Sequence, residues 1–206
     1  MILFVVGEDP TDVGSESYEG DIPLLLANVL ARRFGCRRAT LGELPRTHRG
    51  FGAKLIAAVH LANAQSPPTG GVVFVIDCPL HRHGVLRKEL AAARDSVPIL
   101  PMAIGLAIHE IEAWLLADPE ARRAGMDMEA SRHSYPRPEE DQNPKATYAG
   151  LLGEARARAS SVGAVDTDDF ERRRLLIAAL RPDVVANLCP TGFDPFLKNL
   201  RPFRGT

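Results

Sequence analysis

The stretch Met1-Ile-Leu-Phe-Val-Val-Gly-Glu-Asp-Pro-Thr-Asp12 decides the fold, because an apolar run ends there in a polar corner. A second run, Gly71-Val-Val-Phe-Val-Ile-Asp77, also ends on a carboxylate. Short runs of mostly β-branched residues between turn residues are typical of strands buried on both faces of a parallel sheet. We therefore expect strands over residues 2–6 and 72–76, with Glu8 and Asp77 at their carboxyl ends.

Helical and strand patterns alternate around these two runs. Apolar residues follow a helical spacing in residues 22–34, 52–64 and 84–94, while residues 36–44 and 99–104 fit short strands. The polar residues 7–20 and the Pro- and Gly-rich residues 66–71 predict loops, and Asp21 is expected to cap the first helix. This order predicts an α/β fold, with a parallel sheet flanked by helices on both faces.

The pattern becomes mostly helical after Leu106. Residues 107–118 are expected to form one helix that ends before Pro119, and residues 125–144 to form a long loop. Helices are predicted over 145–160 and 168–180, and a tail that begins at Pro182 is expected to dock through Phe193, Phe196, Leu197 and Leu200. We expect an α/β core over residues 1–118 and a mostly helical extension over 119–206, packed as one compact domain.

Composition narrows the class of protein. The net charge of −1 gives no global basic field of the kind that binds nucleic acid, although a local one can exist because arginines are clustered. No apolar run approaches the roughly 20 residues that cross a bilayer, and the N-terminus lacks a signal-peptide layout. The three cysteines are far apart and odd in number, so we expect reduced thiols in a cytoplasmic protein without a membrane anchor.

Carboxylates follow both of the predicted central strands. Glu8, Asp9 and Asp12 lie just beyond the first strand, and Asp77 ends the later one. Ligands of open α/β sheets bind beyond the carboxyl ends of the strands, and Mg²⁺ prefers carboxylate oxygens while keeping several waters. Any one of these acids is more often a solvated turn residue or a helix cap. The pair Glu8 and Asp77 favours a divalent-metal site for Mg²⁺ or Mn²⁺, with Asp12 as a further ligand.

Other polar residues are weaker candidates from composition alone. Glu112 can face the sheet edge, although a solvated helix face is the simpler interpretation for the acids of this segment, Glu110 included. Arg82 and Lys88 follow Asp77 closely and are the basic residues best placed to hold a phosphate near a metal. Three histidines, whose spacing specifies no site, remain candidate general bases or phosphate contacts: His81, His83 and His109.

These motifs together resemble a known family. Val6-Gly-Glu-Asp-Pro-Thr-Asp12 resembles the first motif of TOPRIM domains, in which a strand-end Glu precedes a Gly/Pro/Thr-type loop, and Val75-Ile-Asp77 resembles the start of their second motif, Asp-x-Asp. Ile108-His-Glu-Ile-Glu-Ala-Trp-Leu-Leu-Ala-Asp118 closely resembles the signature of a bacterial TOPRIM-like family catalogued as a domain of unknown function. Asn143-Pro-Lys145 and Cys189-Pro-Thr-Gly-Phe193 also fit that family, so the resemblance spans nearly the whole chain.

The resemblance implies a TOPRIM core, a Rossmann-like parallel sheet, with a C-terminal helical extension. It also implies kinship with nucleases of the overcoming-lysogenization-defect type, which cut phosphodiesters with Mg²⁺, often beside an ATPase encoded by a neighbouring gene in antiviral defence. Glu8 and Asp77 then become catalytic metal ligands, with Glu112 and secondarily Glu110 as supporting acids. Lys145 becomes a phosphate contact.

The chain departs from the family pattern at one position that matters. Asp-x-Asp would place a second acid at position 79, where this chain has Pro79, and a missing carboxylate removes both a ligand and a negative charge. The leading hypothesis is a Mg²⁺-dependent nuclease or phosphoesterase, and the chain is also compatible with a homodimer. The alternatives are a catalytically degenerate TOPRIM module that binds a protein or nucleic acid, and an enzyme that acts on a small nucleotide.

Overall fold

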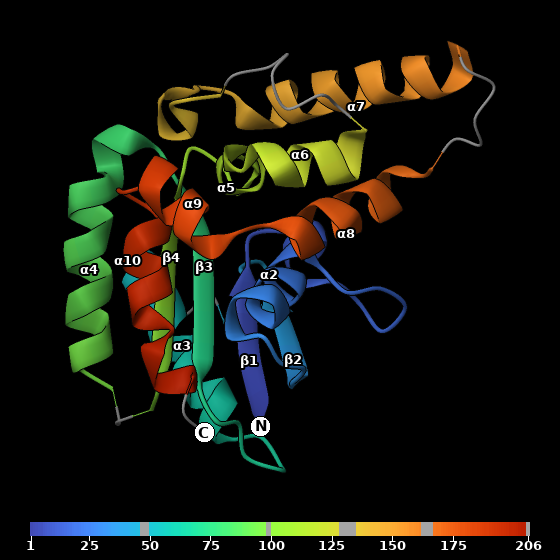
Figure 1. Cartoon of the computed structure of the whole chain (residues 1–206). Coiled ribbons are helices and arrows are strands. Elements are labelled where there is room, and N and C mark those ends of the chain that lie inside the picture. Colours follow the sequence, from blue (N-terminus) through green and yellow to red (C-terminus); the bar gives the residue numbers. More distant parts are fainter. Residues whose placement is uncertain (46–49, 98–99, 128–134, 162–166, 205–206) are drawn as a thin grey trace.

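The computed structural model describes residues 1–45, 50–97, 100–127, 135–161 and 167–204, and within them one parallel sheet lies between two layers of helices (Figure 1). The strands pair in the order β2-β1-β3-β4, and every pair is parallel. Their bounds are β1 Ile2–Gly7, β2 Gly35–Thr40, β3 Val72–Cys78 and β4 Met102–Ile108. The predicted α/β class, with a parallel sheet and helices on both faces, is confirmed.

Each face of the sheet has its own hydrophobic core because side chains alternate along a strand. Leu3 and Val5 of β1 pack in the cluster that contains helix α2 (Asp21–Leu30), whereas Phe4 and Val6 pack in the cluster that contains the helices of the opposite face. Those helices are α3 (Phe51–Asn63) and α4 (His83–Asp95).

The strand order places a topological switch point between β1 and β3. From β1 the chain crosses to β2 on one side, and from β3 it crosses to β4 on the other. The crossover helices α2 and α4 lie on opposite faces of the sheet. Open α/β sheets commonly bind ligands at the carboxyl ends of the two strands that flank such a point, which here are β1 and β3.

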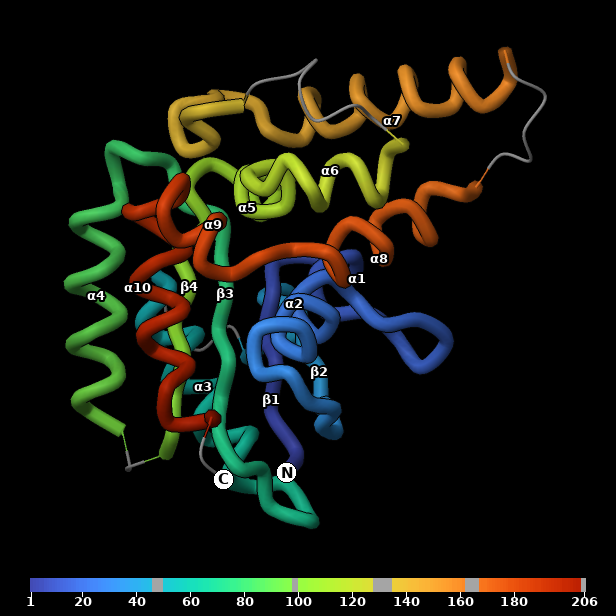
Figure 2. The backbone as a smooth tube through the Cα atoms, viewed as in Figure 1, coloured from blue at the N-terminus to red at the C-terminus, as the bar shows by residue number. Residues whose placement is uncertain are grey.

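The rest of the chain is helical and packs on the α2 face and beyond the carboxyl ends of the strands. In Figure 2, helices α5, α6 and α7 lie past those ends, while α10 runs beside β4. The helices are α5 Glu112–Ala117, α6 Pro119–Met126, α7 Pro144–Ser161, α8 Asp169–Ala179, α9 Pro182–Leu188 and α10 Phe193–Asn199. None of the helices in the described ranges is both long and apolar enough to cross a bilayer.

Aromatic packing attaches the C-terminal tail to α5. Trp114 is fully buried, with its ring centroid 5.2 Å from that of Phe193 and 5.4 Å from that of Phe196. Phe193, Phe196 and Leu200 are themselves fully buried and Leu197 is partly buried, so the tail docks through the four apolar residues that the sequence predicts.

Two expectations around the first helix are corrected. The predicted loop 7–20 contains a short helix, α1 (Pro10–Val13), which Asp9 and Asp12 close with a capping box. Asp21 was expected to cap α2, but Gly20 occupies the cap position and the buried Asp21 side chain binds Arg173 instead. A buried carboxylate needs a cation, and a distant arginine supplies one.

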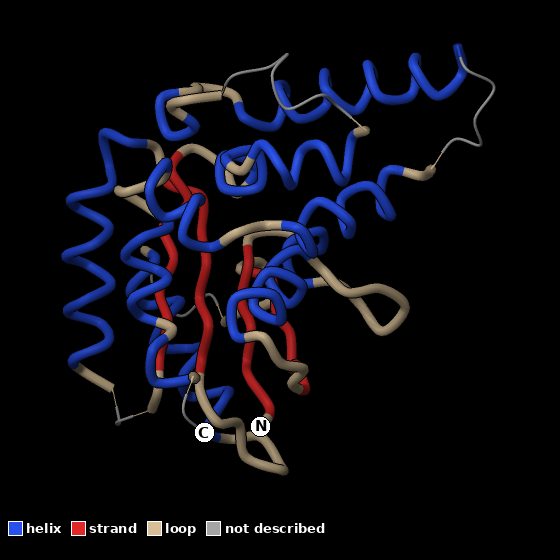
Figure 3. The backbone as a smooth tube through the Cα atoms, in the orientation of Figure 1, coloured by secondary structure: helices blue, strands red, loops and turns tan. Residues whose placement is uncertain are grey.

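The predicted helix 107–118 is wrong at its start, as Figure 3 makes visible at the upper end of β4. Ala107 and Ile108 continue β4 because they pair with Asp77 and Cys78 of β3. His109 then takes a left-handed φ of 63°, and α5 begins only at Glu112. Pairing with β3 therefore overrides the local helical pattern. The predicted loop 125–144 lies partly outside the described residues, and helix α6 just before it was not predicted.

Candidate functional site

Glu8 and Asp77 meet at the switch point of the sheet. Glu8 directly follows β1, and Asp77 is the last residue but one of β3. The Asp77 backbone N–H donates to Glu8 Oε1 at 3.1 Å, although the two residues are 69 positions apart in the sequence. The strand-end acids that the sequence paired are therefore neighbours, and the contact between them spans two adjacent strands.

Neither acid is held in a local cap. Asp77 Oδ1 accepts a hydrogen bond from the Ile111 N–H at 3.2 Å, from the loop that follows β4. Within the described residues, Glu8 Oε2 and Asp77 Oδ2 accept no hydrogen bond from the protein. Each carboxylate thus uses one oxygen to fix its position, while its other oxygen has no protein donor in the described ranges.

The electrostatics of this edge favour a bound cation or proton. Burial raises the pKa of Asp77, and repulsion from the carboxylates of Glu8, Asp12, Glu112 and Glu110 adds to it, so that the pKa reaches about 8. Burial also raises the pKa of Glu8, against the lowering effect of the Asp77 N–H. A positive ion placed between the two carboxylates would relieve both effects.

Asp12 fixes the backbone that carries Glu8. Its Oδ2 accepts hydrogen bonds from the N–H groups of Glu8, at 2.8 Å, and Asp9, at 3.1 Å. Burial, followed by repulsion from Asp9, raises the pKa of Asp12 to about 7. Asp12 was expected to be a metal ligand, but its contacts are those of a group that fixes the backbone of Glu8.

Glu112 lies near the site but is engaged by an arginine. Its Oε1 is 2.9 Å from Arg173 Nη2, and Arg173 also binds both oxygens of Asp21 and lies 4.7 Å from the centre of the Tyr148 ring. These two carboxylates raise the pKa of Arg173, which stays charged. The expected supporting acid Glu112 is therefore part of a buried ion network beside Asp77.

This role of Arg173 is not predictable from its neighbours in the sequence. In the run Arg172-Arg173-Arg174, pairing with the adjacent acids Asp168, Asp169 and Glu171 is the simple local interpretation. Arg174 does pair with Glu171 at 2.6 Å. Arg173 instead reaches Asp21, 152 residues away, and no local pattern distinguishes the two arginines.

Lys145 brings a positive charge to the acidic edge, by which we mean the carboxyl ends of β1 and β3 with Glu8 and Asp77. Its backbone N–H donates to Glu110 Oε2 at 2.7 Å, and its Nζ lies 4.0 Å from Asp9 Oδ2. The charge of Lys145 also lowers the pKa of Glu8. Glu110 thus anchors the start of α7, and this contact sets Lys145 beside the strand-end acids.

The other expected phosphate contacts are not joined to these acids. Arg82 and Lys88 are exposed, and within the described residues no hydrogen bond or ion pair connects either to Glu8 or Asp77. The charge of Arg82 acts on Cys78, whose pKa it lowers against the effect of burial. The prediction that this basic set holds a phosphate beside a metal therefore finds no direct contact to support it.

The three candidate histidines lie in different surroundings. His81 is exposed in the turn Leu80–Arg82, and His83 begins α4 and lines a separate pocket. His109 Nε2 lies 3.4 Å from Gln142 Nε2, beyond the end of β4. The structure brings these side chains neither to one another nor into hydrogen-bond contact with Asp77, as far as the described residues show.

The donor chemistry fits one hard cation. Glu8 and Asp77 offer two carboxylate oxygens, and Mg²⁺ is commonly bound by one or two carboxylates plus waters and substrate oxygens. No group of three or more His, Cys, Asp or Glu side chains arranged to hold a metal occurs in the described part of the chain. Position 79, two residues after Asp77, is a proline and adds no carboxylate, so the two acids suit a single ion and not a pair.

Comparison with known proteins yields no match: no family model fits the chain, and no curated protein or solved structure is significantly similar to it.

Proposed function

We propose that this chain is a Mg²⁺-dependent, TOPRIM-type hydrolase that cuts phosphodiester bonds in nucleic acid. The observation that carries the proposal is the contact between Glu8 and Asp77, two half-buried carboxylates at the switch point between β1 and β3. Perturbed carboxylates at a ligand-binding edge are characteristic of functional sites. The resemblance of the flanking motifs to TOPRIM domains supplies the reaction class.

The proposal gives each nearby residue a distinct task. Glu8 and Asp77 would hold the cation, which, when bound, supplies Lewis acidity to a phosphate oxygen. Lys145 would bind a neighbouring phosphate through its ammonium group, because it lies on the same edge with its charge directed at the acids.

Two further residues would act on these groups indirectly. Asp12 fixes the Glu8 backbone, and Glu110 fixes the start of α7 that carries Lys145. Both are positioning residues in this scheme, because their carboxylate oxygens accept hydrogen bonds from backbone N–H groups.

The test is cleavage of plasmid DNA and of single-stranded RNA by the purified chain with Mg²⁺ or Mn²⁺, and with a chelator. Glu8→Gln and Asp77→Asn keep the oxygens that accept the Asp77 and Ile111 N–H groups but remove the charge. Each is expected to lower the cleavage rate by about 100-fold or more. Glu16→Gln, an exposed acid on the loop before α2, is the matched control and should cut normally. Cleavage that survives both site variants would sink the proposal.

A second candidate function is a TOPRIM-like module that binds without cutting. Pro79 in place of an acid and the engagement of Glu112 by Arg173 favour it, because both leave fewer free carboxylates for metal. It predicts that the wild-type chain neither binds Mg²⁺ nor cuts, yet copurifies with a partner, such as an ATPase from an adjacent gene. An enzyme of mononucleotides would instead turn over nucleotides and leave plasmids intact.

A further inference from the structure

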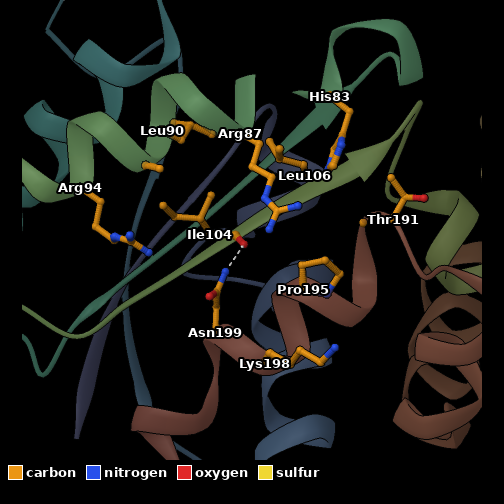
Figure 4. Close-up of a pocket in the computed structure, with 12 residues that line it drawn as sticks. His83, Arg87, Leu90, Arg94, Ile104, Leu106, Thr191, Pro195, Lys198 and Asn199 are labelled. Atoms are coloured by element: carbon orange, nitrogen blue, oxygen red, sulfur yellow. Dashed lines mark hydrogen bonds between the residues drawn. The ribbon is translucent and has the colours of Figure 1, made fainter. Parts of the chain in front are cut away.

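A pocket of about 320 Å³ lies between α4 and α10, on the far edge of the sheet from β2 (Figure 4). Its floor is the edge strand β4, from which Ile104 and Leu106 line it. The other lining residues come from α4 and from the segment around α10: His83, Arg87, Leu90, Ala91, Arg94, Thr191, Gly192, Pro195, Lys198 and Asn199. Neither Glu8 nor Asp77 lines this pocket, so it is distinct from the acidic edge.

The charge of the lining has one sign. Arg87, Arg94 and Lys198 contribute three cations, and none of the lining residues is acidic. Arg94 pairs with Asp95 at 3.0 Å and Lys198 with Asp194 at 2.6 Å, so these two cations are partly neutralised at the exposed rim. Arg87 forms no ion pair with any residue in the described ranges.

Figure 4 shows where the Arg87 side chain goes. Its guanidinium extends from α4 across the pocket toward α10 and lies among Leu106, Ile104 and Pro195. His83 occupies one end, near Thr191. The planar guanidinium of an arginine that has no ion pair in the described part of the chain matches the geometry of a phosphate or carboxylate.

The other polar group of the pocket is held in place. The Asn199 side-chain amide donates to the Ile104 carbonyl at 3.1 Å and covers part of the free edge of β4. That bond fixes the amide and leaves its oxygen as an acceptor beside the pocket. Leu90, Leu106 and Pro195 supply apolar surface between these polar groups. Mixed linings with few fixed polar groups are typical of small-molecule sites, which begin at roughly 300 Å³.

We propose that this pocket binds a small organic anion, with its phosphate or carboxylate on Arg87 and its apolar part against Leu106 and Pro195. The proposal stands apart from the proposed hydrolase function, because the two sites share no residue. The volume fits one small molecule, and the apolar floor favours a ligand with an unsaturated or aliphatic portion over a bare inorganic ion.

The experiment is a titration of the full ¹⁵N-labelled chain with four probes, followed by chemical shifts. Phenyl phosphate and benzoate combine an anion with a ring, inorganic phosphate has only the anion, and benzyl alcohol has only the ring. We expect saturable shifts of the Thr191 and Gly192 amides and the Asn199 side-chain amide with at least one of the combined probes. Inorganic phosphate and benzyl alcohol, which each have only one of the two parts, should bind roughly tenfold more weakly than the better combined probe. The ranking of phenyl phosphate and benzoate distinguishes the two head groups.

Variants on α4 decide whether Arg87 is the anchor. Arg87→Ala is expected to weaken binding of the better combined probe by about tenfold, because a charge-assisted, bidentate contact is lost. Lys88→Ala is the control, because Lys88 is the next positive charge on the same helix but does not line the pocket. This variant should leave binding unchanged. Glu8→Gln should also leave it unchanged, which separates this test from that of the hydrolase. Equal loss in Arg87→Ala and Lys88→Ala, or shifts that never saturate, would overturn the proposal.

Discussion

At the residue scale, the half-buried position of Asp77 destabilises the folded protein whenever its carboxyl group is ionised. One of its oxygens accepts the Ile111 N–H, while burial and four neighbouring acids oppose its ionised form. An ionised carboxylate with no cation beside it is unfavourable in such a position. We therefore expect the folded protein to be more stable when this charge is removed.

Asp77→Asn is predicted to stabilise the protein at neutral pH and, under the proposed function, to lower the cleavage rate. The pKa of Asp77 rises from an ordinary value near 4 to about 8 on folding, so between these values the folded state binds the extra proton. Stability then falls as the pH rises through this window, and the variant should gain up to roughly 5 kcal/mol at pH 8 but little at pH 4, because each pKa unit corresponds to about 1.4 kcal/mol. Urea denaturation without divalent metal, at both pH values, measures the difference. Equal stability of variant and wild type at pH 8 contradicts the argument.

Loss of the Arg173 side chain should lower the free energy of unfolding. Removal of one partner from a buried ion network leaves uncompensated charges, here those of Asp21 and Glu112. Arg173→Met is expected to cost roughly 3–5 kcal/mol in the free energy of unfolding. Arg174→Met next to it breaks only the exposed pair with Glu171 and should change stability little. Denaturation curves that coincide for the two variants would show that the network does not stabilise the fold.

At the element scale, the start of α7 delivers Lys145 to the acidic edge. The helix begins at Pro144, and Glu110 accepts the Lys145 N–H, so the position of this lysine depends on the loop after β4. The left-handed φ of His109 allows that loop to leave the strand and reach α7. The proposed phosphate contact of Lys145 would therefore depend on two segments that are 35 residues apart.

Lys145→Ala is predicted to weaken nucleic-acid binding several-fold and to reduce its dependence on salt concentration, because one phosphate contact is lost. Arg156→Ala is a suitable control, since that side chain lies farther along the same helix and binds Asp169. Filter binding of a DNA duplex at two salt concentrations measures both effects. A salt slope that stays the same in Lys145→Ala would show that this ammonium group does not meet a phosphate.

At the scale of the whole molecule, a cation at the switch point should bind the folded state alone. Glu8 and Asp77 come from different strands, so an unfolded chain does not hold them together. Mg²⁺ at about ten times its dissociation constant should therefore raise the melting temperature by roughly 3 °C. Glu8→Gln should abolish this rise, and Glu16→Gln should retain it. A rise that is equal in all three proteins would place the bound ion elsewhere.

The sequence predicted the parts of this protein that local patterns encode. Short, continuous apolar runs identified β1 and β3. Because polar residues follow each run directly, Glu8 and Asp77 were expected at one edge of a parallel sheet. The docking of the tail through Phe193 and Phe196 followed from their apolar character in the same way. In each case the segment is buried because its own residues are apolar, so the burial is predictable from that segment alone.

Only the tertiary structure decided which groups meet across long stretches of chain. The end of β4 depends on its pairing with β3. The partner of Asp21 depends on the packing of α8 against α2. The pocket lined by Arg87 depends on the approach of α10 to α4. No residue near Arg173 or Arg87 in the sequence marks either one as different from its basic neighbours. Long-range ion pairs and pockets arise from the relative placement of whole elements, which hydrophobic packing sets for the molecule as a unit.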